Sequence, residues 1–376
     1  MNSYWLSSLT LTNFRSYDHL KLELDNSPVV ISGANGSGKT NILEAVSLLT
    51  SGRGLRAAKL SEIDKQGKSD SPYNVFGWAI NAVINSGGEQ TIIGTARETS
   101  RDIDKRIIKI DGEINRASGV LESVFSCLYF IPQMNHIFTD GTGARRGFLD
   151  RLTALFDNEH PKRLGVYEKY MRERRKLLKE NPDDIWLSAT EGTMAEQAVA
   201  IAASRLQATE YIRKAIEISD SSFPKAVIEV KGLVEEIFPK IPALQAEEFF
   251  KSKLKEARKL DFFSGRTNYG IHRSDFSVFY QEKNQPAQNC STGEQKALLL
   301  SIILGAARAK ALWFGASPVL LLDEIVAHLD DTRREELFAE IAGFNIQAWM
   351  TATSPHFFRN YERKMQFFAV EDSVIC

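Results

Sequence analysis

Residues 33–40 form a phosphate-binding pattern. They read Gly-Ala-Asn-Gly-Ser-Gly-Lys-Thr and match G-x-x-x-x-G-K-[ST]. Glycines adopt positive φ at little steric cost, so backbone N–H groups can approach a bound anion closely. In such a loop Lys39 would reach the β- and γ-phosphates of a nucleotide, and the Thr40 hydroxyl would bind Mg²⁺. The predicted cradle consists of Gly33, Ala34, Asn35, Gly36, Ser37, Gly38, Lys39 and Thr40.

The segments on either side of this loop are the strand and the helix that such a site needs. Residues 27–32 include a short β-branched run, which predicts a buried strand. Residues 40–46 carry apolar side chains at helical spacing. A helix that begins at the loop directs the positive end of its dipole towards bound phosphate. A chance glycine-rich turn is the alternative, and the paired strand and helix argue against it.

A second chemical signal lies at the end of an apolar strand near residues 317–324. The run is apolar throughout, as in a central parallel strand, and it ends in Asp323 and Glu324. Asp323 would hold Mg²⁺, and Glu324 would orient and deprotonate an attacking water. An acidic helix cap is the alternative, but Lys39 in the same chain favours nucleotide chemistry. The predicted catalytic residues are therefore Lys39, Asp323 and Glu324.

Residues 291–295 open a helix predicted over residues 296–310. The spacing of Ser291 and Glu294 is that of a capping box, which is the structural interpretation. At a helix start, Ser291 and Gly293 would equally offer donors to a γ-phosphate. Both interpretations stay open at this point.

The composition is that of an ordinary globular protein. The chain has 376 residues, 43% apolar and 25% charged, enough for two or three domains. The net charge is −1, so a nucleic-acid partner would need a local basic patch. Three cysteines without a C-x-x-C pair predict neither a zinc site nor a disulfide framework. The first ten residues lack a signal-peptide pattern and no apolar run reaches membrane length, so we expect a cytoplasmic protein.

Three further segments have distinct patterns. Residues 75–115 contain short β runs, and Asp111-Gly112 predicts a two-residue hairpin within an antiparallel sheet. Apolar side chains at helical spacing predict an arm of two antiparallel helices within residues 145–219. Residues 181–184, Asn-Pro-Asp-Asp, would stop the first helix and cap the second. Residues 246–260 predict another amphipathic helix. Lys and Arg outnumber Asp and Glu by 11 to 6 over residues 141–180. That excess indicates either a solvated face or a contact with DNA.

The order of these motifs resembles that of ABC-type ATPases. In that class the helix-start signature serves the nucleotide of the opposite subunit, so Ser291, Gly293 and Glu294 would close a partner's site. Gln133, after a strand predicted at residues 127–131, resembles a Q-loop residue that binds nucleotide and metal. Residues 327–330 resemble a D-loop, with Asp330 as its nucleotide-binding residue. Thr351-Ala352-Thr353 ends the last core strand, where many ABC ATPases have a switch histidine.

With these residues the chain is similar to the bacterial RecF family, DNA-repair ATPases related to the heads of SMC proteins. The similarity covers nearly the whole length. It rests on residues 13–16, 33–41, 145–150, 270–273, 291–295, 323–324 and 351–353. Gln133 and the Ser-Thr-Gly-Glu signature depart from the commonest form, which indicates a divergent branch. The resemblance adds Arg15 and Asn41 to the nucleotide-binding residues, and the predicted metal ligands are Thr40, Gln133 and Asp323.

The resemblance implies an α/β fold: an ABC-type P-loop ATPase head with an antiparallel β subdomain and an inserted helical arm lobe. The predicted segments are 1–140, the part of ATPase lobe I with the P-loop; 141–260, the helical arm and lobe II; and 261–376, the core with signature and Walker B strand.

The resemblance also implies a function. Such a protein would bind ATP and Mg²⁺, dimerise on ATP, and bind single-stranded, gapped and duplex DNA against cations such as Arg53, Arg56, Arg145 and Arg146. It would assist RecO and RecR in loading RecA during gap repair, replication restart and SOS induction, with slow ATP hydrolysis as a release switch. The alternatives are the ATPase subunit of an ABC transporter and an SMC-like scaffold that does not hydrolyse ATP.

Overall fold

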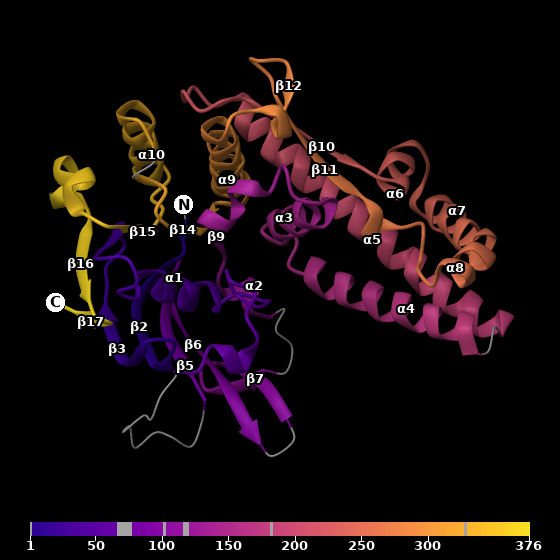
Figure 1. Ribbon diagram of the computed structural model, residues 1–376, viewed down its shortest axis with the longest axis horizontal. Coiled ribbons are helices and arrows are strands. Elements are labelled where there is room, and N and C mark those ends of the chain that lie inside the picture. Colours follow the sequence, from indigo (N-terminus) through magenta and orange to yellow (C-terminus); the bar gives the residue numbers. More distant parts are fainter. Residues whose placement is uncertain (1, 66–76, 101–102, 116–119, 181–182, 327–328) are drawn as a thin grey trace. The chain divides into compact units, whose positions relative to one another are not determined.

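The computed structural model describes residues 2–65, 77–100, 103–115, 120–180, 183–326 and 329–376. They divide into two units (Figure 1). The first unit comprises Met1–Met134, Asp220–Phe223 and Ala307–Cys376; the second comprises Asn135–Ser219 and Pro224–Ala306. The division into segments 1–140, 141–260 and 261–376, expected from the sequence, remains a prediction.

A mostly parallel sheet forms the centre of the first unit, as the apolar runs predicted. Its strands occur in the order β17-β16-β4-β15-β14-β9. Their bounds are β17 Val374–Ile375, β16 Gln366–Glu371, β4 Val29–Ser32, β15 Ala348–Ala352, β14 Val319–Leu322 and β9 Cys127–Phe130. The strands from β16 to β9 are parallel. Because carboxyl ends of parallel strands share one edge, the loops that follow β4, β14 and β9 meet there.

The second sheet of this unit is antiparallel, in the order β3-β2-β5-β6-β7-β8. Its strands are β2 Trp5–Phe14, β3 Tyr17–Glu23, β5 Ala79–Ser86, β6 Glu89–Ser100, β7 Ile103–Ile110 and β8 Glu113–Asn115. Asp111 and Gly112 both have positive φ, 50° and 86°, which confirms the predicted hairpin turn. Residues 75 and 76, predicted to begin a strand, lie outside the described residues.

The remaining elements of the first unit are mostly short. Helices are α1 Lys39–Ser47, α2 Leu121–Val124 and α10 Asp331–Gly343, with 3₁₀ turns at Leu60–Glu62 and Pro355–Lys364. The short strands β1 Asn2–Ser3 and β13 Ala316–Ser317 pair in parallel. A 3₁₀ turn, Pro132–His136, lies where the chain passes from the first unit to the second.

The second unit is mainly helical. Its helices are α3 Thr142–Ala154, α4 His160–Glu180, α5 Asp184–Glu217, α6 Leu233–Ile237, α7 Ala243–Glu256 and α8 Arg258–Ser264. An antiparallel sheet contains β10 Ala226–Lys231, β11 Asp275–Tyr280 and β12 Gln285–Pro286. Tyr167 of α4 and Phe250 of α7 lie in one core with Ala198 and Ile201 of α5. The two predicted arm helices are thus present as α4 and α5.

Two predictions made from local sequence patterns can be compared with the structure at the start of α5 and the end of α7. The Asp183 carboxylate accepts hydrogen bonds from the backbone of Ile185 and Trp186, both at 2.9 Å, as the predicted N-cap should. The helix predicted over residues 246–260 is confirmed in part, because the structure divides this segment into two helices, α7 and α8, which meet at Ala257. The ψ of Ala257 is −6°, so the last turn of α7 tightens there. Alanine carries no breaking signal in the sequence.

Helix α9, Thr292–Phe314, includes residues of both units. Among the described residues it is the one helix long and apolar enough to cross a membrane by length and composition. However, 78% of its apolar window is buried within the structure, as in the core helix of a globular protein. From the sequence alone, we expected no apolar run long enough to span a membrane.

Candidate nucleotide site

The predicted phosphate loop connects β4 to α1. Gly36 and Gly38 have φ of 83° and 109°, which other residues adopt only with strain. A Cβ on Gly33 would lie 2.2 Å from the carbonyl oxygen of Val370 in β16. Sequence and structure therefore agree on why these positions are glycine. The backbone of Gly33 also donates a hydrogen bond of 3.2 Å to Ala352 of β15, which joins the loop to the sheet.

Lys39 is a buried cation without an anionic partner. Its Nζ donates to the carbonyl oxygens of Gly33 and Ala34, both at 2.7 Å. It forms no ion pair with any described residue. Burial lowers the pKa of Lys39, while the charges of Glu324 and Asp323 oppose that shift. A phosphate at this loop would be the counter-ion that the ammonium lacks.

Asp323 follows β14 and is a buried carboxylate whose described partners are hydroxyls. The Thr40 hydroxyl lies 3.1 Å from both carboxylate oxygens. Thr351 of β15 donates to Oδ1 at 2.7 Å. A buried carboxylate without a cationic partner is costly, so a cation bound beside Asp323 and Thr40 would stabilise it. This pair of residues confirms that α1 and β14 meet where the motifs predicted.

Glu324 has a strained backbone and a free carboxylate. Its φ of 56° is unusual for a residue with a side chain. Its backbone N–H donates to the Thr351 hydroxyl at 2.9 Å. Within the described residues, its carboxylate has no hydrogen bond or ion pair. That carboxylate is available to a water, as a general base requires.

The site fits a Mg²⁺-nucleotide. Lys39 and Asp323 are buried charges of opposite sign, and neither forms an ion pair with a residue that the structure describes. The Ser37 hydroxyl, in the loop itself, is buried and without a partner. No group of three or more His, Cys, Asp or Glu suited to a metal occurs in the described residues. Mg²⁺ commonly needs only one or two carboxylates, because phosphates and waters complete its octahedron.

Arg15 belongs to an ion-pair cluster beside the loop. Its guanidinium donates to the Glu44 carboxylate at 2.8 and 2.6 Å and to the Glu62 carbonyl at 2.6 Å. Glu44 of α1 is fully buried and also accepts from Arg56 at 2.9 Å. Sequence reasoning missed Glu44, whose signal was a lone carboxylate in an apolar helix. The role of Arg15 as a nucleotide ligand stays a prediction.

Asn41 and Gln133 are the other predicted ligands of this unit. Asn41 donates to Ser16 at 2.9 Å and accepts from Arg56 at 2.8 Å. Gln133 is exposed in the turn that follows β9, at the same sheet edge as Asp323. A contact between Gln133 and nucleotide or metal stays a prediction.

Tyr17, at the start of β3, is a residue that sequence reasoning missed. Its buried hydroxyl has no partner, and a Cβ on Gly38 would lie 2.8 Å from it. Burial raises the pKa of Tyr17, so the phenol stays protonated. The phenol therefore lies against the phosphate loop and explains why Gly38 has no side chain.

The predicted signature residues form a helix cap in the second unit. The Ser291 backbone donates to the Glu294 carboxylate at 2.8 Å, and the Glu294 backbone donates to the Ser291 hydroxyl at 3.4 Å. The structural interpretation of this motif, a capping box, is therefore confirmed. Lys283 pairs with Glu294 and, with the capping bonds, lowers the pKa of that carboxyl to about 2. A Cβ on Gly293 would meet nothing within 4 Å.

Asp330 and His272 also have structural partners. Asp330 caps α10 by accepting from the Arg333 backbone at 2.9 Å. Residues 327 and 328 of the predicted D-loop lie outside the described residues. His272 lies between the Tyr167 hydroxyl and the Thr267 carbonyl, each at 2.9 Å, and burial lowers its pKa. His272 is thus a half-buried residue whose ring nitrogens both have structural partners.

Three of the four cations predicted to face DNA are held by intramolecular contacts. Arg145 pairs with Asp275 at 2.8 Å, and Arg146 donates to the Ser274 carbonyl at 2.9 Å. Arg56 pairs with Glu44. Arg53 is exposed.

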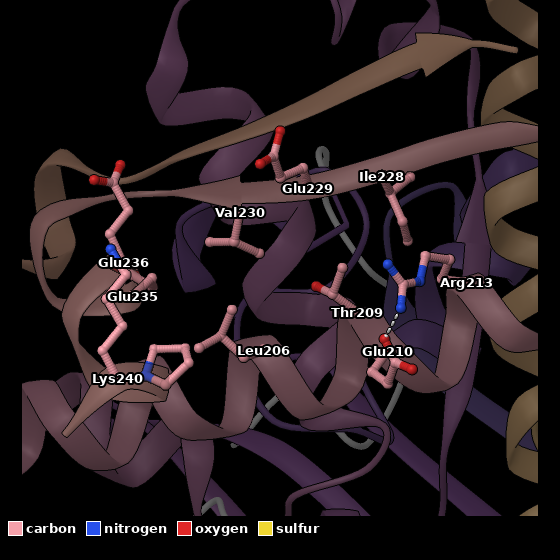
Figure 2. A pocket seen from close by; sticks show the side chains of 11 residues that line it. Leu206, Thr209, Glu210, Arg213, Ile228, Glu229, Val230, Glu235, Glu236 and Lys240 are labelled. Carbon is pink, nitrogen blue, oxygen red and sulfur yellow. Dashed lines mark hydrogen bonds and ion pairs between the residues drawn. The ribbon is translucent and has the colours of Figure 1, made fainter. Parts of the chain in front are cut away.

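A hollow of about 360 Å³ lies in the second unit between α5, β10 and α6 (Figure 2). Its rim carries both acidic and basic side chains, and Arg213 pairs there with Glu210. The predicted nucleotide-binding residues, all of which are described, do not line it.

Comparison with known sequences identifies the family to which this chain belongs. A family model described as RecF/RecN/SMC N terminal domain matches residues 5–375. The DNA replication and repair protein RecF of Rickettsia felis is 40% identical over 374 residues, which covers 97% of this chain and 98% of the relative. The RecF protein of Rickettsia akari is 39% identical over 371 residues, covering 97% and 99%.

Comparison with solved structures supports the fold. A recombination mediator protein RecF with ATP, from the RecFOR pathway, aligns with a TM-score of 0.84 at 24% identity and covers 100% of this chain and 99% of its own. An Smc head domain from Pyrococcus furiosus aligns with a TM-score of 0.56 at 16% identity, covering 99% and 95%. The predicted ABC-type head fold is therefore confirmed.

Proposed function

This chain belongs to the RecF family of DNA replication and repair proteins, and we propose that it is an ATP-dependent, DNA-binding member with slow ATP hydrolysis. The observation that carries the proposal is the pair of buried charges at Lys39 and Asp323, neither of which forms an ion pair with a described residue. An ATP–Mg²⁺ complex would supply both opposite charges, with phosphate for Lys39 and the metal for Asp323. The RecF structure that matches this fold was solved with ATP.

Each site residue has a role in this proposal. Lys39 and the N–H groups of the loop would bind phosphate, and Asp323 with Thr40 would hold Mg²⁺, with Gln133 as a further ligand. The metal would neutralise phosphate charge when bound. Glu324 would take a proton from water. Thr351 would hold Asp323 and the Glu324 backbone in place through its hydroxyl.

We further propose a composite site in a homodimer. Ser291, Gly293 and Glu294 of one copy would close over the nucleotide on Lys39 of the other, with Asp330 nearby. The Ser291 hydroxyl accepts only a long 3.4 Å bond in the cap, so it remains able to donate to phosphate. A ligand at roughly 100 times its Kd contributes about 2.7 kcal/mol to the state that binds it. Two such ligands would favour a dimer strongly.

Sedimentation velocity tests the composite site. We expect wild type to dimerise with ATP, Glu324→Gln to remain dimeric longer because proton transfer is prevented, and Lys39→Met to stay monomeric. A wild type that stays monomeric at saturating ATP would reject the composite site. A dimer that forms equally well with and without ATP would contradict the proposal that ATP controls dimerisation.

The proposed polymer ligand is DNA, as the names of the relatives suggest. Binding should weaken with salt, with a log–log slope of about −0.9 per phosphate neutralised on duplex. Crosslinking to a gapped duplex, with and without ATP, separates wild type from Lys39→Met if ATP controls DNA binding. Equal crosslinking by both proteins under both conditions would contradict that control.

The family and the RecFOR pathway named for the matching structure support a proposal for the wider role. We propose RecO and RecR as partners, RecA loading as the outcome, and the bacterial cytoplasm as the location, since the DNA is there. Family membership over the whole chain removes the transporter alternative. A scaffold without hydrolysis remains the second candidate, and single-turnover ATP hydrolysis separates the two.

A further inference from the structure

Cations and aromatic rings follow one another along α7, α8 and the turn after α8, and we call these residues the strip. The strip consists of the half-buried Lys251, the exposed Lys255, Lys259, Phe262 and Phe263, and the exposed Arg266 in the turn after α8. Lys251 and Lys255 are four residues apart on α7, and Lys259 and Phe263 are four residues apart on α8, beyond the break at Ala257. Residues four apart lie on the same side of successive helical turns. The buried side chains of the two helices, such as Leu254 and Asp261, lie on other faces.

The four cations of the strip are not held in ion pairs. Lys251, Lys255, Lys259 and Arg266 form no ion pair with other described residues. Between them, Lys253 pairs with Glu256 at 2.8 Å, and Arg258 pairs with Glu191 at 2.6 Å. Lys253 and Arg258, which lie off the strip, therefore have carboxylate partners in ion pairs. The strip cation Lys255 forms no ion pair with a described residue, although Arg258 and the charge of Lys255 both lower the pKa of Asp184. Such a row of unpaired cations attracts a polyanion.

The two aromatic rings of the strip are unusually exposed. Phe263 is 82% exposed and Phe262 is 47% exposed. Their ring centroids lie 5.4 Å apart, with the ring planes at 76°. A phenylalanine ring has no polar handle, so its exposure is unfavourable unless a ligand covers it. Exposed rings among cations are the feature on which unpaired bases stack.

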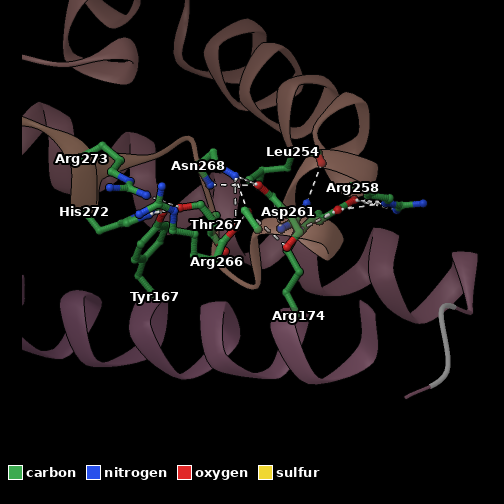
Figure 3. Close-up of polar contacts among 12 residues, drawn as sticks. Tyr167, Arg174, Leu254, Arg258, Asp261, Arg266, Thr267, Asn268, His272 and Arg273 are labelled. Atoms are coloured by element: carbon green, nitrogen blue, oxygen red, sulfur yellow. Dashed lines mark hydrogen bonds and ion pairs between the residues drawn. The ribbon is translucent and has the colours of Figure 1, made fainter. Parts of the chain in front are cut away.

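A buried polar network holds this strip in place (Figure 3). Asp261, next to Phe262, accepts from Arg174 of α4 at 2.6 Å and from the side chain of Asn268 at 2.7 Å. Arg174 also donates to Glu191 of α5 at 2.9 Å. The network thereby fixes α8 and the turn after it to two long helices. A surface that is already ordered loses less entropy when it binds.

We propose that this strip binds single-stranded DNA, with phosphates on the cations and unpaired bases on Phe262 and Phe263. The inference rests on the proposed DNA-binding function and names the part of DNA that this surface takes. Duplex bases are stacked on each other, so their faces are unavailable to the rings. A protein-docking surface is less favoured, because lysine is depleted at the centres of such interfaces.

The test measures binding of the full-length protein to a dT oligonucleotide and to a blunt duplex. The double variant Phe262→Ala/Phe263→Ala should bind dT at least about tenfold more weakly, because each stacked base contributes substantially. Its affinity for duplex should be unchanged. Lys259→Gln/Arg266→Gln should reduce the magnitude of the salt slope for dT by about 0.7 for each phosphate that is no longer neutralised.

Leu244→Ala is the matched control, since Leu244 is 76% exposed on α7 but outside the strip. Thermal melting of each variant checks that it folds. If the phenylalanine variant keeps wild-type affinity for dT, or binds dT and duplex equally poorly, the strip is not a base-stacking site. If wild type binds neither dT nor duplex, the proposed function itself fails, so the two failures are distinguishable.

Discussion

Thr351 shows how one hydroxyl can organise the chemistry of a site. It donates to Asp323 at 2.7 Å and accepts from the Glu324 backbone at 2.9 Å. Both hydrogen-bonding functions of the hydroxyl are therefore used on the two acidic residues. Hydrogen bonds of this kind orient the groups that hold a metal. The Glu324 backbone, at φ 56°, has this bond to help offset its strain.

Replacing Thr351 by valine tests this bridge. Thr351→Val keeps the shape but leaves Asp323 without one of its hydroxyl donors. We expect the Mg²⁺ concentration needed for tight ATP binding to rise about 10- to 100-fold, as is typical when a residue that orients a metal ligand is replaced. Nucleotide titrations at several Mg²⁺ concentrations measure this directly.

Thr351→Ser is the matched control, because serine keeps the hydroxyl and should behave like wild type. Thr353→Val is a second control, because it removes a hydroxyl two residues along the chain that takes no part in the bridge to Asp323. If the valine variant at 351 binds ATP and Mg²⁺ as wild type does, Thr351 does not position these residues.

At the scale of elements, the start of α9 shows a motif with two uses. The capping box of Ser291 and Glu294 satisfies backbone donors of the first turn. The same residues are proposed to close a nucleotide site on another copy. One motif can serve both because the cap occupies the backbone donors of Ser291 and Glu294 but leaves the hydroxyl proton of Ser291 available.

The pKa of Glu294 leads to a prediction about pH. Its folded pKa of about 2 lies below its ordinary value of 4.5, because Lys283 and the Ser291 backbone favour the charged form. A lowered carboxyl pKa stabilises the fold fully above pH 4.5, and that contribution is lost as pH falls towards 2. Urea unfolding of wild type and Glu294→Gln should therefore differ at about pH 6 and converge as pH falls below about 4.5.

High salt should reduce the difference between these two proteins at about pH 6, since the Lys283 pair is exposed and screened. The difference in free energy of unfolding between wild type and Lys283→Gln should depend on pH in the same direction but by a smaller amount. A difference that stays constant from about pH 6 to about pH 3 would rule out the charge of Glu294 as its cause.

At the scale of the whole molecule, nucleotide binding should be visible in stability. A ligand that binds only the folded state raises its free energy of unfolding by an amount set by concentration over Kd. The site residues come from both ends of the chain, since Lys39 and Asp323 are far apart in sequence. ATP should therefore stabilise the first unit as one cooperative body.

We expect a non-hydrolysable ATP analogue with Mg²⁺ at roughly 100 times its Kd to stabilise the protein by about 2.7 kcal/mol. Differential scanning calorimetry measures the rise in melting temperature. Lys39→Met should abolish most of the rise, because the buried counter-ion for phosphate is gone. An equal rise in this variant would place the nucleotide elsewhere.

Local patterns in the sequence were sufficient for the phosphate loop, the strand before it, the helix after it and the acidic strand end. Glycine spacing, β-branched runs and helical periodicity are written in consecutive residues, so these elements could be predicted. The Asp111-Gly112 hairpin and the Asp183 cap were predictable for the same reason. The resemblance to RecF then organised these elements into a head fold.

Only the tertiary structure decided which side chains meet. Thr351 contacts Asp323 because β15 pairs with β14 in parallel, and a register between distant strands is not encoded in either strand alone. Arg15, Arg56 and Arg145 are ion-paired because carboxylates reach them from other segments. The break at Ala257 arises close to Asp261, which is bound by Arg174. The sequence by itself determined which chemically active residue types are present and in which motifs. Tertiary packing determined which of their charges are held in ion pairs, because the carboxylate partners come from distant segments.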